Sequence, residues 1–297
     1  MKLGTLIPQN DTGGTPAAIR EFAQAAEELG YHYLAAADHV LGVNIASRPD
    51  WGNLNTSADW FHDPFVLFGF LAGFSKLEFS TGVLILAQRQ AALVAKQAAC
   101  LDVLCNGRFR FGVGVGWNPV EFTGLNENFN DRGRRSEEQV QVMQALWAEP
   151  HVTFEGKWHR IEDAGINPLP VHRRIPVWFG GHHDQTLRRI AKWGDGWMML
   201  AYPAGPEAVA EFDKLRRYTR QAGRDPATIG IEIWTSTAVG DENVWREEFL
   251  FWKRAGVTHV TVASTHGRGI HARIPGRTMA DHLEAITRYR HAVADLL

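Results

Sequence analysis

The feature that most limits how this chain can fold is an alternation of strand-like and helix-like segments from one end to the other. Residues 3–8 and 33–37 are short apolar runs typical of buried strands. Between them, residues 15–30 have helical spacing, with Thr15 in the N-cap position and Gly30 at the end. The same pairing recurs eight times in 297 residues. This pattern predicts a closed (β/α)8 TIM barrel, an α/β fold, rather than the alternative of a doubly wound open sheet.

We expect a single domain over residues 1–297, because no linker, repeat or low-complexity tract divides the chain. Three connections are longer than simple turns: 40–62, 148–175 and 264–277. The middle connection contains a segment typical of a short hairpin. The first and last follow the second and eighth strands, so we expect insertion loops at the C-terminal face of the strands, where such barrels carry their chemistry. We expect these loops to cover a substrate cavity.

Charge and composition exclude several classes of protein. The 31 basic and 33 acidic residues give a net charge of −2, so we expect no nucleic-acid or membrane partner. No run of about 18 apolar residues predicts a membrane span, and the first residues lack the apolar core of a secretory signal. Cys100 and Cys105 are not spaced as a metal or disulfide motif. We therefore expect a cytoplasmic protein without a metal site.

The segment 107–117, GRFRFGVGVGW, carries an unusual face of glycines. Gly112, Gly114 and Gly116 share one parity, so in a strand they share one face. The segment does not match the dinucleotide fingerprint, which needs GxGxxG and an acidic residue about 20 positions later. A strand face without side chains packs poorly unless another body fills the space. Either a neighbouring strand or helix approaches closely there, or a planar ring lies against the strand.

Four segments, taken with Asp38-His39, resemble the luciferase-like monooxygenase family and, more narrowly, its branch of probable F420-dependent oxidoreductases: 1–9, 81–122, 132–149 and 178–198. The resemblance runs in matching order over residues 1–200, and only the pattern of elements continues it beyond. It implies a barrel that binds a deazaflavin or isoalloxazine ring at its carboxyl end, and a homodimer. It also implies a non-prolyl cis peptide on the third strand, at Gly82-Val83, against that ring.

The pair Asp38-His39, at the end of the second strand, is the predicted catalytic centre. The resemblance places His39 near the reactive ring carbon, where an imidazole can orient the substrate or move a proton. It gives Asp38 the role of fixing the tautomer or the position of the imidazole ring by a hydrogen bond. From the residues alone, a histidine at a strand end is more often a structural partner.

The resemblance also assigns the coenzyme contacts. The turn Phe179, Gly180, Gly181 and His182 precedes a helix N-terminus, which favours a phosphate, although a close-packing turn or a metal site with His183 are alternatives. Further predicted contacts are Gln88, Arg89, Gly114, Gly116, Trp117 and Asn118. Arg89 reaches either the coenzyme or a carboxylate of its own chain, and Asn118 either caps a short helix or donates to a hydroxyl.

These observations favour an oxidoreductase that transfers hydride between reduced F420 and an apolar or aromatic small-molecule substrate. The aromatic residues Trp51, Trp60 and Phe61 of the first long connection suggest that substrate class, although core packing also explains them. One alternative is an FMN-dependent monooxygenase of the same family, because the family includes users of both coenzymes. A barrel hydrolase or lyase without a redox coenzyme and a non-catalytic coenzyme carrier are further alternatives.

Overall fold

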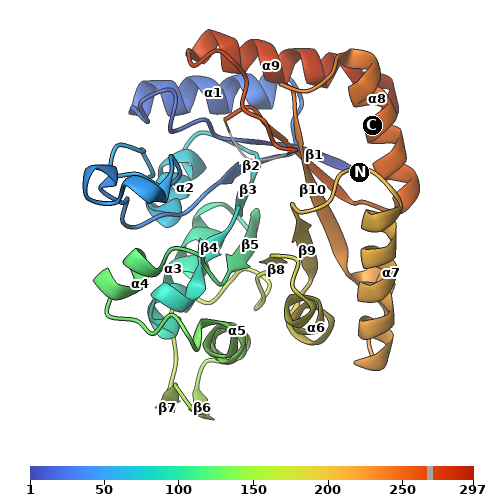
Figure 1. Ribbon diagram of the computed structural model, residues 1–297. Coiled ribbons are helices and arrows are strands. Elements are labelled where there is room, and N and C mark those ends of the chain that lie inside the picture. The colour runs from blue at the N-terminus through green and yellow to red at the C-terminus, as the bar shows by residue number, and fades with distance from the viewer. Residues whose placement is uncertain (266–269) are drawn as a thin grey trace.

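The computed structural model, which describes residues 1–265 and 270–297, is a closed barrel of parallel strands (Figure 1). The pairing order is β3-β2-β1-β11-β10-β9-β8-β5, and a further pairing of β3 with β5 closes the ring. The predicted TIM barrel is therefore confirmed. The barrel strands are β1 (Lys2–Leu6), β2 (Tyr33–Ala36), β3 (Glu78–Thr81), β4 (Leu84–Ile85), β5 (Phe109–Gly114), β8 (Val177–Gly180), β9 (Gly196–Met199), β10 (Gly230–Ser236) and β11 (His259–Ala263).

Helices surround the strands on the outside of the barrel (Figure 1). Several begin at the polar N-caps that their sequences supply: the side chains of Thr15, Asp63, Asp241 and Thr278 accept backbone N–H groups of the first turn. The helices are α1 (Pro16–Glu28), α2 (Pro64–Ala72), α3 (Ala91–Leu104), α4 (Pro119–Gly124), α5 (Arg132–Ala148), α6 (Asp184–Trp193), α7 (Pro206–Gln221), α8 (Glu242–Ala255) and α9 (Met279–Ala292). No helix of the described ranges is long and apolar enough to cross a membrane.

The third strand of the barrel is not continuous. It is divided into β3 and β4, and the peptide bond between Gly82 and Val83, which separates them, is cis. This is the position that the family resemblance implies. β3 pairs with β2 and with the start of β5, whereas β4 pairs only with the end of β5. The chain therefore leaves the regular ladder at Gly82 and re-enters it two residues later.

The glycine face of β5 makes room for this interruption. A Cβ atom on Gly112 would overlap the carbonyl oxygen of Thr81, and one on Gly114 would overlap the side chain of Val83. Gly116 lies just past the strand with a φ of +76°, and a Cβ there would lie 2.7 Å from Ile85. Of the two explanations that the sequence left open, close approach of a neighbouring strand is the one the structure shows.

The amino-terminal half of the barrel interior is filled by a buried charged network. The Arg110 guanidinium pairs with Glu232, and its Nε lies 3.0 Å from the carboxylate of Glu78. The same guanidinium lies over the rings of Tyr33 and Trp178. Burial raises the pKa of Tyr33 well above its ordinary value, so this phenol stays protonated. Large side chains and paired charges thus close this end, which leaves the carboxyl ends of the strands as the open end.

The long connections differ in what they contact. The middle one forms an antiparallel hairpin of β6 (Val152–Glu155) and β7 (Arg160–Ala164), as predicted. Glu138 of α5 accepts the N–H groups of residues 157–159 and so fixes the hairpin to that helix. The first connection contains two single-turn 3-10 helices, Ile45–Ser47 and Pro49–Trp51. Of the predicted loop 264–277, residues 266–269 lie outside the described residues.

The contact between Gly114 and Val83 predicts a coupled effect on stability. Gly114→Ala should lower the free energy of unfolding by about 1–3 kcal/mol, because the added methyl overlaps Val83. The double variant with Val83→Ala should lose at least about 0.5 kcal/mol less than the sum of the two single variants. Urea denaturation measures all three. Gly69→Ala, at a helical position with nothing within 4 Å, is the control and should not destabilise; additive losses at Gly114 and Val83 would contradict the packing.

Candidate active site

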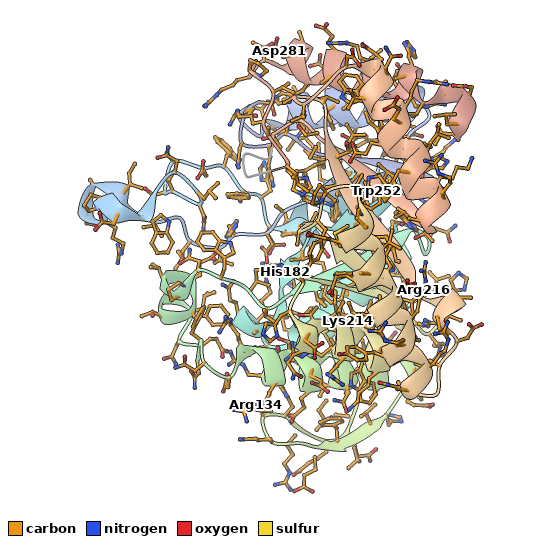
Figure 2. The ribbon with its side chains drawn as sticks, turned by 45° about the vertical axis from the view of Figure 1, so that its right-hand side comes forward. Arg134, His182, Lys214, Arg216, Trp252 and Asp281 are labelled. Atoms are coloured by element: carbon orange, nitrogen blue, oxygen red, sulfur yellow. The ribbon has the colours of Figure 1, made fainter. Side chains whose placement is uncertain are left out.

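A cavity of about 920 Å³ lies at the carboxyl ends of the barrel strands. Its wall combines residues from strand ends with residues of the 40–62 connection. Three predicted site residues, His39, Trp117 and His182, come together in this wall, and Figure 2 labels His182. Other lining residues are Leu6, Ala37, Ile45, Phe61 and Leu200.

The His39 ring is held by a buried carboxylate that sequence reasoning missed. Nδ1 of His39 lies 3.2 Å from Oε2 of Glu121, so Nδ1 carries a proton and donates to that oxygen. Glu121, only 1% exposed, also accepts the backbone N–H of Val40 at 2.7 Å and, weakly, that of Leu41 at 3.3 Å. Burial alone would raise the pKa of Glu121, but these hydrogen bonds lower it on balance. His39 therefore faces the cavity with one nitrogen fixed and the ring orientation set.

Glu121 reaches this position because α4 begins immediately after β5. Asn118 caps the helix: its Oδ1 accepts the N–H of Val120 at 2.9 Å, which is one of the two roles that the sequence allowed for it. Glu121 is flanked by Val120 and the buried Phe122. An acidic residue between apolar ones, one turn after a predicted strand end, was the available sequence signal.

Asp38 does not hold His39, contrary to the role predicted for it. Its Oδ2 accepts the N–H of Ile85 at 3.0 Å, and its Oδ1 pairs with Arg89 at 2.7 Å. Arg89 also pairs with Asp63, the N-cap of α2, at 2.9 Å. Burial raises the pKa of the Asp38 carboxyl, and Arg89 opposes that shift. Arg89 thus takes the own-chain alternative, and the three residues tie the end of β2 to the loop after β4.

Aromatic residues of the 40–62 connection cover His39. The Phe61 ring lies edge-on to the His39 ring, with 4.8 Å between centroids, and Trp117 lies edge-on at 5.9 Å. Trp51 stacks on Trp117 at 5.7 Å with an angle of 30° between the planes. Two of the three aromatic residues that the sequence suggested, Trp51 and Phe61, therefore form a wall at the histidine.

The connection that follows β11 is also fixed at the mouth, and again by a buried carboxylate. Asp11, in the loop after β1, pairs with Arg273 of the last connection and lies 3.2 Å from Nε2 of His282 on α9. Burial alone would raise the pKa of Asp11, but His282 and Arg273 lower it on balance. His282 in turn hydrogen-bonds Ser264, at the end of β11, through Nδ1 at 2.8 Å. Asp11 and Arg273 both line the cavity.

Small residues surround the point where the third strand is interrupted. A Cβ on Gly82 would lie 3.0 Å from the Trp234 ring and 3.7 Å from Ala35. The Val83 side chain turns the other way, toward Gly114 and Gly180. Trp234 and Ala35 form a small apolar cluster with Leu6 and Ala263. Alanine and glycine on several strands thus leave this level of the barrel without bulky side chains, apart from Trp234.

The predicted phosphate turn lies directly before α6. Gly181 has a φ of +109°, which a side chain would strain, and its carbonyl accepts the Trp197 Nε1–H at 2.6 Å. His183 is the N-cap of α6, where its ring accepts a backbone N–H, so it is not arranged with His182 as a metal ligand. The described part of the chain contains no group of three or more residues able to hold a metal ion.

The remaining predicted contacts lie away from the cavity wall. The Phe179 ring belongs to the main hydrophobic core, and Gln88 is buried with its amide directed at Glu121 at 3.4 Å. Space beside Gly114 is taken by Val83, and that beside Gly116 by Ile85 and Phe122. The geometry therefore does not support direct coenzyme contacts by the Cα atoms of these two glycines.

Comparison with known proteins identifies the family. The sequence model of one protein family, the luciferase-like monooxygenases, matches residues 1–293 of this chain. The chain belongs to the luciferase-like monooxygenase family. It is 27% identical over 269 residues to an uncharacterized protein of Mycobacterium tuberculosis (strain ATCC 25618 / H37Rv), covering 88% of this chain and 90% of the relative.

Relatives with stated activities use two different coenzymes. An FMNH(2)-dependent dimethylsulfone monooxygenase of Pseudomonas fluorescens (strain Pf0-1) is 29% identical over 219 residues, which are 72% of this chain and 56% of that enzyme. A solved structure of an F420-dependent secondary alcohol dehydrogenase, in complex with an F420-acetone adduct, superposes with a TM-score of 0.79 at 18% identity, over 100% and 99% of the two chains. At this low identity, the likeness to the F420-dependent enzyme shows that the two proteins share a fold.

The buried Arg89 pairs predict a large effect on stability. Arg89→Met should lower the free energy of unfolding by about 3–5 kcal/mol, because it leaves the buried Asp38 carboxylate without its cation. Arg188→Met is the matched control: the Arg188 side chain is 49% exposed against 16% for Arg89, so the loss of its solvent-screened pair with Asp184 should destabilise the protein much less. Guanidinium denaturation compares them, and equal losses would contradict the buried-pair description.

Proposed function

We propose that this family member is an F420-dependent oxidoreductase that transfers hydride between the reduced coenzyme and an apolar or aromatic small molecule. The observation that carries the proposal is the pairing of His39 with Glu121 in the wall of a 920 Å³ cavity at the barrel mouth. The aromatic wall of Trp51, Phe61 and Trp117 matches a flat apolar substrate.

The residues at the mouth fit a planar coenzyme ring. Ala35 and Ala263 present little side chain at the level of the interruption, and the Trp234 ring beside Gly82 offers a flat aromatic surface there. Gly181 and the N-terminus of α6 are suited to an anionic group such as a phosphate, because the first N–H groups of a helix point outward with a partial positive charge. When bound, the reduced deazaflavin supplies a hydride. The fit favours F420 and FMN alike, and the resemblance of the sequence to the F420 branch favours F420.

The chain itself supplies orientation and a proton. Glu121 fixes the Nδ1–H of His39, so in the imidazolium form of the ring Nε2–H is the donor. It delivers its proton to the substrate atom bonded to the carbon that receives hydride, which leaves a neutral ring with its proton on Nδ1. Reduction of a carbonyl, for example, needs one hydride at carbon and one proton at oxygen, and this arrangement meets both needs. The connection that carries Trp51 and Phe61 excludes water from the reacting centre.

A coenzyme titration tests the proposal directly. Apoprotein titrated with F420 and, separately, with FMN in a calorimeter should bind F420 in a saturable manner and more tightly than FMN. Tight FMN binding without F420 binding would instead support the FMN-dependent monooxygenase. Binding of neither would contradict both and favour chemistry without a redox coenzyme.

His39 and Glu121 should affect turnover rather than coenzyme affinity. His39→Ala should lower the hydride-transfer rate by about a hundredfold or more, because it removes the proton donor. Glu121→Gln, which keeps an acceptor but removes the charge, should lose less than His39→Ala. Single-turnover absorbance changes of F420 measure the rates, and calorimetry the affinities. Turnover at the wild-type rate in His39→Ala would remove this residue from the mechanism.

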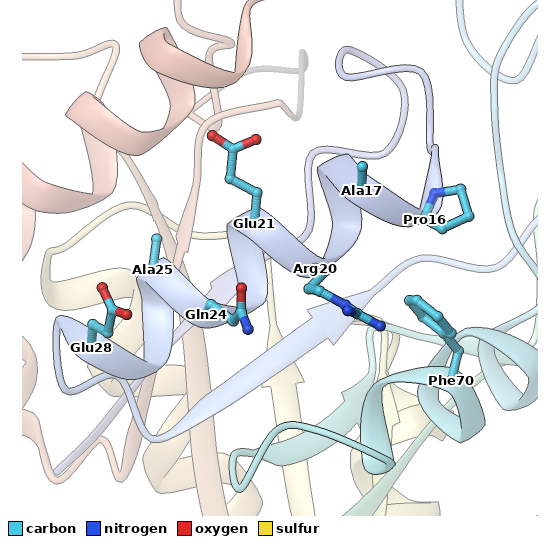
Figure 3. A pocket seen from close by; sticks show the side chains of 8 residues that line it. All are labelled: Pro16, Ala17, Arg20, Glu21, Gln24, Ala25, Glu28 and Phe70. Carbon is cyan, nitrogen blue, oxygen red and sulfur yellow. The ribbon is translucent and has the colours of Figure 1, made fainter.

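We also propose that the protein is a homodimer through α2 and α3. The α2 sequence, PFVLFGFLA, is apolar on every side, which is typical of a helix covered all round. Even so, Val66 on α2 is 70% exposed, and Leu93 and Leu104 on the adjacent α3 are 53% and 67% exposed. Beside this face, a surface hollow between α1 and Phe70 of α2 is lined mostly by polar and charged side chains of α1, such as Arg20 and Glu28 (Figure 3).

Charged substitutions test this interface. Val66→Glu combined with Leu93→Glu should convert a dimer to a monomer, because two carboxylates per chain would be buried without partners. Size-exclusion chromatography with light scattering gives the mass. Val239→Glu, which alters an exposed valine in the connection between β10 and α8, should leave the mass unchanged. A wild-type protein that is monomeric at micromolar concentration would contradict the proposal.

A further inference from the structure

A second cavity, of about 590 Å³, lies at the mouth but away from His39. It is formed by the loop after β9, the end of β10, the first half and middle of α8, and Ile270. It shares no lining residue with the first cavity. Its wall is mainly apolar and aromatic, and Trp252 of α8, labelled in Figure 2, belongs to it. The principal apolar residues are Tyr202, Trp234, Val244, Phe251, Trp252 and Ile270.

The charged residues that line this cavity are two glutamates of α8, Glu247 and Glu248. The Glu248 carboxylate accepts hydrogen bonds from the Thr235 hydroxyl and the Trp252 indole N–H, each at 3.0 Å. Both donors are neutral. A half-buried carboxylate held by neutral donors has no cation beside it, and its surroundings solvate it less well than water does. Its negative potential therefore extends into an apolar cavity.

The nearby cations are engaged elsewhere. Arg246 of α8 pairs with Asp295 at 2.6 Å, and Arg288 pairs with Glu242 at 2.6 Å, both outside the lining of the cavity. Burial lowers the pKa of His271 on balance, although its hydrogen bond to the carbonyl of Leu200, at 2.8 Å, and the charge of Glu248 oppose that shift, so this ring is not counted as a cation. Among residues 1–265 and 270–297, no ion pair to Glu247 or Glu248 is formed. The cavity thus has negative charge and no compensating cation within the described chain.

We propose that this second cavity binds an organic cation with an apolar or aromatic body, such as an arylalkyl ammonium. The apolar wall receives the body of the ligand, and it includes the aromatic residues Tyr202 and Phe251. The faces of aromatic rings attract cations. Glu247 and Glu248 supply the counter-charge. A neutral ligand would gain the apolar contacts alone, and an anionic ligand would be repelled. The site is separate from the proposed coenzyme cavity and does not depend on the identity of the coenzyme.

Phenethylammonium and 2-phenylethanol form a matched pair of probes, because they share a ring and chain and differ in charge. Calorimetry on the full chain should give saturable binding of the ammonium and weaker binding of the alcohol. Glu248→Gln should weaken ammonium binding roughly tenfold, as expected for loss of one partly desolvated charge contact. It should leave alcohol binding unchanged. Glu242→Gln, on the same helix but paired with Arg288, is the control and should bind as the wild type does.

Three results would overturn the proposal: no saturable ammonium binding by the wild type, equal affinity for both probes, or unchanged affinity in the double variant Glu247→Gln, Glu248→Gln. Competition supplies a further readout. Phenethylammonium should not displace F420 or FMN, because the two cavities share no lining residue. Displacement would place the probe in the first cavity instead. Failure of coenzyme binding with intact ammonium binding would contradict only the proposed function.

Discussion

The candidate site depends on how one buried carboxylate is paired. Asp38 lies at the end of β2 with its side chain 1% exposed, and a charge in that position is tolerated only with close partners. Its partners are the guanidinium of Arg89 and the N–H of Ile85, both beyond the interruption of the third strand. Arg89 then reaches Asp63 at the start of α2. One ion-pair network therefore sets the relative positions of β2, β4 and α2, and with them the position of His39, the next residue after Asp38.

The barrel interior is divided into a filled half and an open half. Toward the amino ends of the strands, Arg110, Glu232, Tyr33 and Trp178 occupy the axis with large side chains and paired charges. Toward the carboxyl ends, alanine and glycine replace them, and the chain of the third strand itself crosses into the space beside Gly114. This division explains why the cavity is found at the mouth, where residues of many strand ends are presented together. Both long connections that follow barrel strands are also held at this end, through Glu121 and through Asp11.

Much of the fold was predictable because it depends on local pattern. Thr15, Asp63 and the alternation of apolar runs set helix starts and strand positions, and parallel closure follows from their order. The contacts across the mouth were not predictable from residues alone, since they join segments that are far apart in sequence: 51 positions for Asp38 and Arg89, and 82 for His39 and Glu121. The family resemblance located the cis peptide at Gly82-Val83, but not that the glycines of β5 make room for it. Asp38 was located at the end of the second strand, but it was expected to hold the His39 ring. Its carboxylate instead pairs with Arg89 and accepts the N–H of Ile85.

The central claim is that the barrel mouth, between the interruption of the third strand and His39, is where the coenzyme ring lies. A structure of the protein crystallised with F420 tests it most directly. The account predicts difference density for the ring in the 920 Å³ cavity, in contact with His39. Density for the ring at any other place on the molecule, with that cavity filled only by water, would contradict the account.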